Sequence, residues 1–107
     1  MKFTIDKRIL TEAVGNLQRA VSTKTSIPAL EGILIRTDVE KIILSAYDLE
    51  IGMQTELPAV ISAPGAIILT ARLFSEIVRK SPAEDVTVES DDRNTATITS
   101  GVSCFTI

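Results

Sequence analysis

The side chains of this 107-residue chain offer few of the combinations that catalysis requires. The sequence contains no histidine and a single cysteine, Cys104, so a serine or cysteine nucleophile would have no imidazole base beside it. Histidine and cysteine are also the usual ligands of zinc and of redox metals. We therefore expect no catalytic residue, no metal site and no cofactor. Cys104 lies in an alternating segment, where we expect a small core residue.

Adjacent carboxylates occur twice, at Glu84-Asp85 and at Asp91-Asp92. Paired carboxylates support glycosidase or metal chemistry when they converge on one site. Here both pairs lie where the pattern predicts a strand entry or a turn, and acidic side chains in turns bond to the local backbone. A turn role is therefore the favoured interpretation.

The positively charged residues form the one pattern with a functional interpretation. Residues 7–21 and 71–80 both have the period of an amphipathic helix, with aliphatic side chains on one face and charged side chains on the other. The charged faces hold Arg8, Glu12 and Arg19 in the first segment and Arg72, Glu76 and Arg79 in the second. Taken alone, each face fits a solvated helix in which Arg and Glu four residues apart form weak pairs.

The distribution of charge favours a binding surface over a merely solvated one. Residues 1–24 and 71–80 contain eight Lys or Arg and three acidic residues, whereas the rest of the chain contains three Lys or Arg and eleven acidic residues. The expected helices are thus basic and the expected strands acidic, although the formal net charge is −3. Lys and Arg without interleaved aromatic residues suit phosphate contacts rather than base stacking. Such binding would ignore nucleic-acid sequence and weaken steeply with salt.

An internal repeat indicates how these helices are positioned. Residues 3–14 and 67–78 align at a separation of 64 positions, and each copy reads as a short strand, a capping residue (Asp6 or Thr70) and a helix. Three alternating strands follow each helix, so the pattern is β-α-β-β-β written twice, with residues 58–65 as the connection. The expected strands are 2–5, 31–37, 42–46 and 49–57 in the first half and 67–69, 85–90, 95–99 and 102–107 in the second. The pattern predicts an internally duplicated α+β fold with two helices packed on antiparallel sheets.

Length and composition set further limits. Residues 1–107 are enough for one ordinary domain. No stretch reaches the ~18 apolar residues of a membrane helix, and charged residues interrupt any N-terminal signal. A lone cysteine is typical of a cytoplasmic protein, and we expect no membrane partner. The apolar alternation is still running at Ile107, from which we expect a piece of a longer protein.

Five groups of residues, in order, carry a resemblance over the whole chain. They are Met1-Lys2-Phe3-Thr4, Ile27-Pro28-Ala29-Leu30, Asp48-Leu49-Glu50-Ile51, Pro64-Gly65-Ala66 with Ala71-Arg72-Leu73-Phe74, and Ser100-Gly101 with Phe105-Thr106-Ile107. This series resembles the N-terminal domain of the bacterial DNA polymerase III beta subunit, the DNA sliding clamp.

The resemblance implies the DNA-clamp fold and a processivity factor of DNA replication. It implies a homodimer of three-domain chains that forms a ring around duplex DNA and tethers the replicative polymerase, with the helices facing the hole. Such a protein is a non-catalytic accessory subunit of the polymerase holoenzyme, in the cytoplasm. The polymerase and the clamp loader would bind through domains that this chain lacks.

The resemblance also implies functional residues. Lys24 falls where the family often has a DNA-contacting arginine, and lysine keeps the charge but loses the planar fork. Arg72 matches a DNA-contacting arginine at the start of the second helix. The remaining expected DNA contacts, supported mainly by the helical wheels, are Arg8, Arg19 and Arg79. The residues expected at the contact with the other protomer are Ile77, Phe105 and Ile107. The alternative is a protein-interaction or oligomerisation domain that uses its strand edges without DNA contact.

Overall fold

The computed structural model describes residues 1–19, 32–47 and 52–107. Its helices are α1 (Lys7–Gln18) and α2 (Ala71–Lys80). The strands within the described ranges are β1 (Lys2–Asp6), β2 (Gly32–Asp38), β3 (Lys41–Tyr47), β4 (Gly52–Pro58), β5 (Val60–Ala63), β6 (Ala66–Thr70), β7 (Asp85–Ser90), β8 (Ala96–Ser100) and β9 (Ser103–Thr106). The α+β class predicted from the repeat is confirmed.

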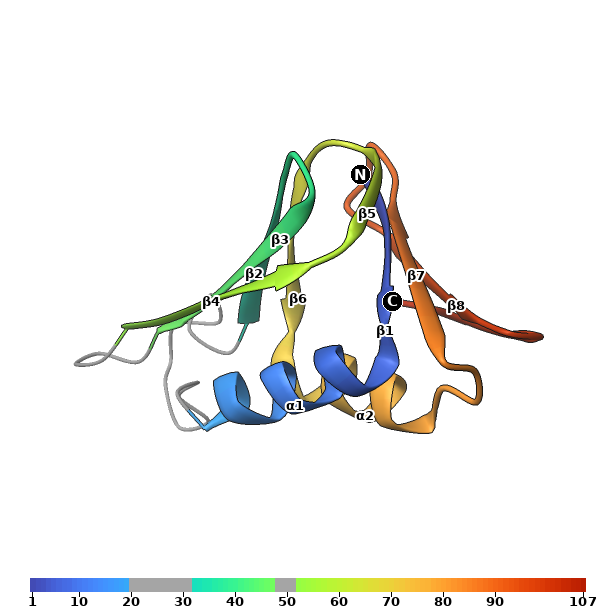
Figure 1. Ribbon diagram of the computed structural model, residues 1–107, viewed down its shortest axis with the longest axis horizontal. Coiled ribbons are helices and arrows are strands. Elements are labelled where there is room, and N and C mark those ends of the chain that lie inside the picture. Colours follow the sequence, from blue (N-terminus) through green and yellow to red (C-terminus); the bar gives the residue numbers. More distant parts are fainter. Residues whose placement is uncertain (20–31, 48–51) are drawn as a thin grey trace.

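The strands form two antiparallel sheets. Sheet A has the order β5-β1-β7-β8-β9, and sheet B has the order β4-β3-β2-β6. In Figure 1 the sheets lean toward each other at the top and diverge toward the bottom, where α1 and α2 lie side by side across the open base. Both helices therefore lie on one side of the molecule, with the strands above them.

Each half of the repeat supplies a strand to the other half's sheet. β1 belongs to the first half but pairs along all five of its residues with β7 of the second half. β6 occupies the same place in the second half and pairs along all five of its residues with β2 of the first half. The two repeats are therefore interlocked. Because α1 directly follows β1 and α2 directly follows β6, the exchange brings the two helices together.

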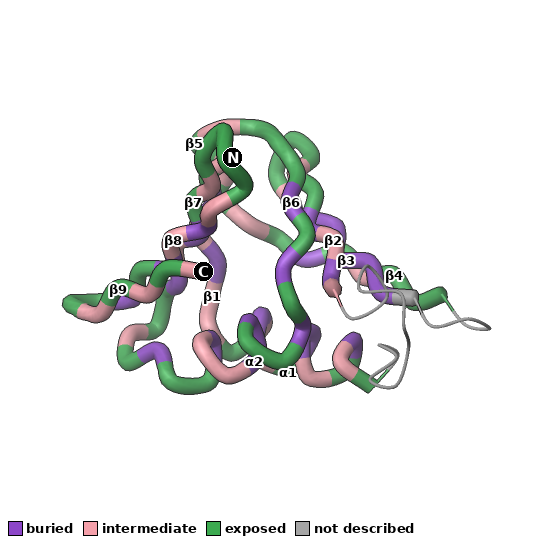
Figure 2. The backbone as a smooth tube through the Cα atoms, turned by 180° about the vertical axis from the view of Figure 1, so that it is seen from behind, coloured by how far each residue is buried: buried purple, intermediate pink, exposed green. Residues whose placement is uncertain are grey.

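Aliphatic side chains fill the space between the sheets and the helices. Phe3 and Ile5 alternate with exposed or half-buried residues along β1, and β2, β6, β7 and β8 show the same alternation of buried and less buried positions (Figure 2). In the central strand β3, by contrast, residues 42–46 are all buried. Phe74 of α2 is completely buried against this core. Burying a side chain of that size contributes about 2–3 kcal/mol to folding. The helices are thus fixed by their apolar faces, which leaves their charged faces free.

The strand β5 is absent from the predicted set, because residues 58–65 read as a connection. The strand has only four residues and lies between Pro58 and Pro64, so no long alternation signals it. It nevertheless pairs with β1 and forms one edge of sheet A. Residues 20–21, 31 and 49–51 of the predicted elements lie outside the described residues.

Two further residues lie differently from their prediction. Cys104 is exposed rather than buried. It lies in the edge strand β9, where Phe105 occupies the core-facing position and leaves Cys104 on the outer face. Leu73, expected on the apolar face of the second helix, is 38% exposed. The neighbouring Phe74 takes the buried position at this level of α2.

Candidate nucleic-acid interface

The start of α1 is fixed by side-chain hydrogen bonds. Asp6 has extended backbone geometry at the N-cap, and its Oδ1 accepts a hydrogen bond from the amide of Ile9 at 3.1 Å. The hydroxyl of Thr11 donates to the carbonyl of Lys7 at 2.7 Å. The predicted cap at Asp6 is therefore confirmed, and it holds the first-turn residue Arg8 in a defined helical position.

The two ends of α2 are fixed by other interactions than the start of α1. Thr70 occupies the N-cap, but its side chain makes no capping hydrogen bond, so the prediction that it caps the helix is wrong. The next residue, Ala71, is buried, and packing fixes this end instead. At the other end, buried Ser81 donates from its amide to the carbonyl of Val78 at 3.2 Å and from its hydroxyl to the carbonyl of Ile77 at 2.8 Å.

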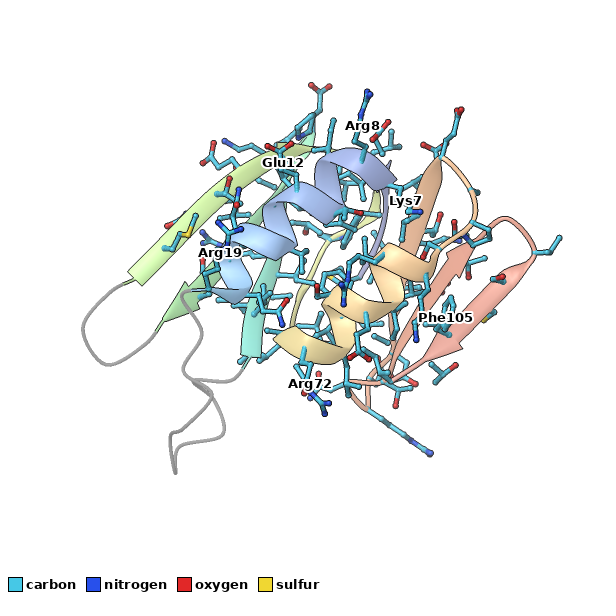
Figure 3. All side chains as sticks on the ribbon, turned by 90° about the horizontal axis from the view of Figure 1, so that it is seen from below. Lys7, Arg8, Glu12, Arg19, Arg72 and Phe105 are labelled. Atoms are coloured by element: carbon cyan, nitrogen blue, oxygen red, sulfur yellow. The ribbon has the colours of Figure 1, made fainter. Side chains whose placement is uncertain are left out.

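The outward sides of the two helices form one surface. α1 and α2 run in roughly opposite directions, with Arg8 and Arg72 at opposite edges of the pair and Arg19 at the far end of α1 (Figure 3). We call this the basic helix surface, and its cations are Lys7, Arg8, Arg19, Arg72, Arg79 and Lys80. All of them are exposed except Lys7, which is half-buried. The acidic residues on the same two helices are Glu12 and Glu76.

The cations of the basic helix surface are not neutralised within the described part of the chain. There, no Lys or Arg of this surface has a carboxylate oxygen within the 4.0 Å limit of an ion pair. The ion pairs that do form lie on the strands, where Lys2 is 4.0 Å from Glu89 and Lys41 is 3.0 Å from Glu56. The Arg–Glu pairs that would make each helix face an ordinary solvated one are therefore not formed.

This difference between helices and strands gives the molecule two electrostatic sides. On the strand side, Lys2 and Lys41 form ion pairs with Glu89 and Glu56. On the helix side, six cations and two acidic residues form no ion pair with one another or with any other residue in the ranges 1–19, 32–47 and 52–107. Exposed, unpaired guanidinium and ammonium groups on neighbouring helices create a positive potential that attracts polyanions. Phosphate oxygens are the partners that such groups bind best.

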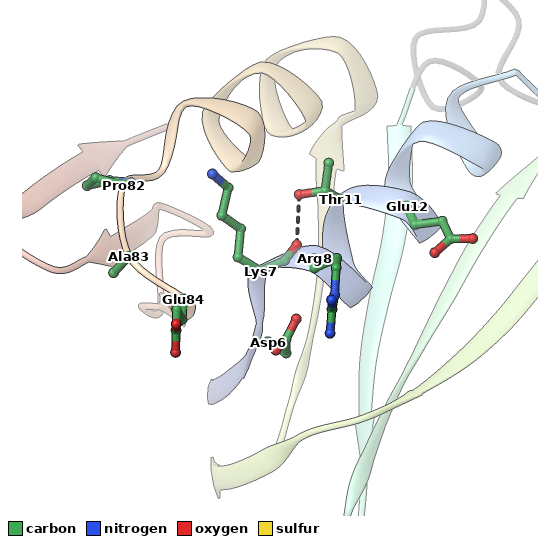
Figure 4. A pocket seen from close by; sticks show the side chains of 8 residues that line it. All are labelled: Asp6, Lys7, Arg8, Thr11, Glu12, Pro82, Ala83 and Glu84. Carbon is green, nitrogen blue, oxygen red and sulfur yellow. Dashed lines mark hydrogen bonds between the residues drawn. The ribbon is translucent and has the colours of Figure 1, made fainter.

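A cleft beside the start of α1, at the edge of the basic helix surface, is lined by side chains of both charges. It is lined by Asp6, Lys7, Arg8, Thr11 and Glu12 and, in the turn after α2, by Pro82, Ala83 and Glu84 (Figure 4). The amide of Lys7 donates to the carbonyl of Glu84 at 2.7 Å, which joins the two walls. Two cations and three carboxylates nearly balance there.

The residues assigned to a contact with the other protomer are all half-buried. Ile77 lies in α2, Phe105 in the edge strand β9 and Ile107 directly after that strand. Each packs against the core while keeping part of its surface exposed. Ile107 also exchanges two backbone hydrogen bonds with Ala96, of 2.7 and 2.9 Å. Figure 3 shows Phe105 on the side of sheet A, whose edge strands are β5 and β9.

The structure adds two cations to the predicted site, and a third cation, which the sequence predicted, cannot be placed. Lys24 lies outside the described residues. Lys7 and Lys80 were counted in the charge distribution but not assigned to the site, although both belong to the basic helix surface. Figure 3 shows Lys7 beside the last turn of α2. A helical wheel drawn for one helix cannot reveal this, because it depends on the opposite directions of the two helices.

Among the described residues, no three His, Cys, Asp or Glu side chains come together in a way that could hold a metal ion. In the same residues, neither helix has the length and apolar character needed to cross a membrane.

The whole chain, residues 1–107, matches the family model described as DNA polymerase III beta subunit, N-terminal domain. It is 35% identical to the beta sliding clamp of Halalkalibacterium halodurans and 36% identical to that of Bacillus subtilis, covering 100% of this chain and 30% of each relative. The crystal structure of the beta subunit of DNA polymerase from Streptococcus pyogenes superposes with a TM-score of 0.95 at 29% identity, over 100% of this chain and 29% of that one. The chain thus spans less than a third of the length of these relatives.

Proposed function

The chain belongs to the DNA polymerase III beta subunit family, as its N-terminal domain, and from this premise we propose that it forms one section of a sliding clamp that encircles duplex DNA. In this proposal the basic helix surface faces the DNA and the sheets form the outer wall. The protein acts as a processivity factor: it keeps the replicative polymerase on its template and catalyses no reaction itself.

The observation that carries the proposal is that, in the described part of the chain, no ion pair neutralises the positive charge of the basic helix surface. Phosphates lie on the outside of a duplex, so cations projecting from two adjacent helices can contact them without reading the bases. The exposed arginines that we assign to these contacts are Arg8, Arg19, Arg72 and Arg79. We assign the same role to Lys24, outside the described residues. Each such contact is screened by solvent and salt, so the chain alone should bind DNA weakly.

Weak contacts suit a clamp that must move along DNA. A ring is retained because it is closed, and strong or sequence-specific contacts would only slow its movement. The acidic strands support the same arrangement, since they make the outer wall unattractive to phosphates. The net charge of −3 is therefore compatible with a DNA-binding inner surface.

The ring requires contacts that this chain supplies only in part. We propose that the longer protein has three such domains, that two protomers form the ring in the cytoplasm, and that Ile77, Phe105 and Ile107 meet the other protomer. The half-buried apolar surfaces of Phe105, in the edge strand β9, and of Ile107, directly after it, support this assignment. The polymerase and the clamp loader would bind through the parts of the longer protein that this chain does not include.

A topological experiment tests the proposal. The longer protein would be loaded by its clamp loader onto nicked circular DNA and onto the same DNA after linearisation, and retention would be followed by gel filtration. We expect the protein to stay on the circle and to leave the linear DNA through its ends. Equal retention on both forms would show that affinity rather than encirclement holds the protein.

The edge strands β4 and β9 also support a second candidate, an oligomerisation module without DNA contact. The same experiment separates the two functions. A pure oligomerisation module would assemble through these edges but would be retained on neither the circular nor the linear DNA.

A further inference from the structure

Two glutamates interrupt the positive charge of the basic helix surface. Glu12 lies in α1 and Glu76 in α2, and they are the acidic residues of these two helices. They occupy equivalent places in the repeat, 64 positions apart, and each follows an arginine, Arg8 or Arg72, by four residues. Residues four apart lie on the same face of a helix, and Figure 3 shows Arg8 and Glu12 along the same edge of α1. Each half of the repeat thus presents one arginine with one carboxylate beside it.

The described part of the chain gives these carboxylates no stabilising ionic contact. There, neither one has a Lys or Arg nitrogen within the 4.0 Å limit of an ion pair. Figure 4 shows the carboxylate of Glu12 directed away from the guanidinium of Arg8. Neither glutamate lies in the first turn of its helix, where a carboxylate would favour the helix dipole. The recurrence of a glutamate at this place in both helices is therefore not explained by the stability of the helices.

The position of the carboxylates matters when a duplex lies on the basic helix surface. One helical turn rises about 5.4 Å, and B-DNA carries one negative charge per about 1.7 Å of its axis. A phosphate bound by Arg8 or Arg72 therefore has neighbouring phosphates close to the glutamate of the same helix. At physiological salt the Debye length is about 8 Å, so the repulsion between the carboxylate and these phosphates is only partly screened. Each arginine contact is opposed by a repulsion of similar range.

We propose that Glu12 and Glu76 limit the strength of DNA binding by repelling the phosphates beside those that Arg8 and Arg72 bind. This inference rests on the function proposed above, and it identifies two residues that set the affinity of the basic helix surface. A clamp benefits from such a limit, because each phosphate contact must be released before the ring can advance. The arginines hold the helices against the duplex, and the glutamates shorten the time that each contact lasts.

The test measures binding of the 107-residue chain to a short duplex by fluorescence anisotropy. The double variant Glu12→Gln with Glu76→Gln removes both charges and keeps the size of the side chains. At low ionic strength it should bind about fivefold more tightly, and this gain should shrink as salt screens the repulsion. A gain of affinity is not an effect that unfolding produces, and circular dichroism checks that the variant is folded.

A matched control separates this local effect from net charge. Glu40→Gln with Asp92→Asn removes two negative charges as well, at exposed positions in the turns after β2 and β7. These turns are not part of the basic helix surface, so the control should tighten binding by a much smaller factor. An equal gain in the two double variants would overturn the inference, because net charge would then explain it.

A further pair of variants separates repulsion of phosphate from pairing with arginine. Glu12→Gln is measured alone and together with Arg8→Gln. If the carboxylate repels phosphate directly, its removal should tighten binding by the same factor in both backgrounds. A gain that vanishes without Arg8 would mean that Glu12 acts by pairing with this arginine in solution, and the proposal would be wrong.

Failure of this inference is distinguishable from failure of the proposed function. If removing both glutamates leaves the affinity unchanged while charge reversal at Arg8 and Arg72 weakens binding, the inference is wrong and the DNA-binding surface stands. If charge reversal at the two arginines has no effect either, the assignment of DNA to the basic helix surface is wrong, and the inference with it.

Discussion

The hydroxyl of Thr37 forms hydrogen bonds with both backbone polar groups of Gly65: it accepts from the amide at 2.9 Å and donates to the carbonyl at 3.2 Å. The amide of Thr37 donates to the same carbonyl at 3.0 Å. Thr37 lies in sheet B, and Gly65 lies in the turn that carries the chain from β5 of sheet A to β6 of sheet B. These bonds continue the pairing of β2 with β6 in sheet B by one residue beyond Arg36 and Ala66, at the top of the molecule, opposite the helices (Figure 1).

Replacing Gly65 by alanine should lower the free energy of unfolding by about 1–3 kcal/mol. The backbone φ of Gly65 is +156°, and a Cβ there would lie 2.9 Å from the Cβ of Met1. Met1 cannot easily withdraw, because its carbonyl accepts a hydrogen bond from the amide of Ser90 at 2.8 Å. Urea unfolding followed by circular dichroism measures the change. An unaltered midpoint would show that this contact is not tight in solution.

The same substitution at Gly15 should have the opposite sign. Gly15 lies inside α1, and a Cβ there would meet no heavy atom within 4 Å. Alanine in a helix interior is favoured over glycine by about 0.5–1 kcal/mol, because it restricts the unfolded chain. Gly15→Ala should therefore raise the urea midpoint. A loss of stability at Gly15 would mean that α1 packs more tightly than the structure shows.

The N-caps of the two helices should respond differently to alanine. Asp6→Ala removes the hydrogen bond to the amide of Ile9 and should lower the free energy of unfolding by about 1 kcal/mol. Thr70→Ala removes a side chain that makes no capping bond, so it should change stability little. Thermal unfolding of both variants against the unsubstituted chain makes the comparison. Equal losses would show that Thr70 caps α2 in solution.

Sequence periodicity predicted those elements whose signal is local. The bounds predicted for α2 and β7, residues 71–80 and 85–90, are the observed ones, because each segment carries a full amphipathic or alternating pattern. β5 was missed because four residues between prolines give too short a pattern. The exchange of β1 and β6 between the two sheets could not be read from the sequence either. It depends on which distant strands pair, and a repeat does not encode that choice.

For the candidate site, too, the sequence predicted what depends on one helix and not what depends on the packing of two. The helical wheels correctly placed Arg8 and Arg72 on exposed faces. They could not show that these arginines leave the glutamates one turn away unpaired, since this depends on side-chain rotamers. They also omitted Lys7 and Lys80, whose place on the basic helix surface follows from the antiparallel packing of the two helices. A helical wheel describes one helix, whereas the basic helix surface is formed by α1 and α2 together.

The electrostatic role of the basic helix surface can be tested by charge reversal. The double variant Arg8→Glu with Arg72→Glu should weaken binding to a short duplex, measured by fluorescence anisotropy at low ionic strength. Because each phosphate contact releases counterions, the slope of log affinity against log salt should fall by about 1 for each arginine removed. The loss should be the same for duplexes of different sequence, since the contacts are to phosphate.

A second double variant separates a local surface from net charge. Arg36→Glu with Arg93→Glu changes the net charge by the same amount, but Arg36 lies in β2 and Arg93 in the turn after β7. Both residues are exposed, so neither substitution disturbs the core. If DNA binds at the basic helix surface, this control should retain nearly the full salt slope. Equal losses in the two double variants would mean that overall charge, and not the pair of helices, governs the interaction.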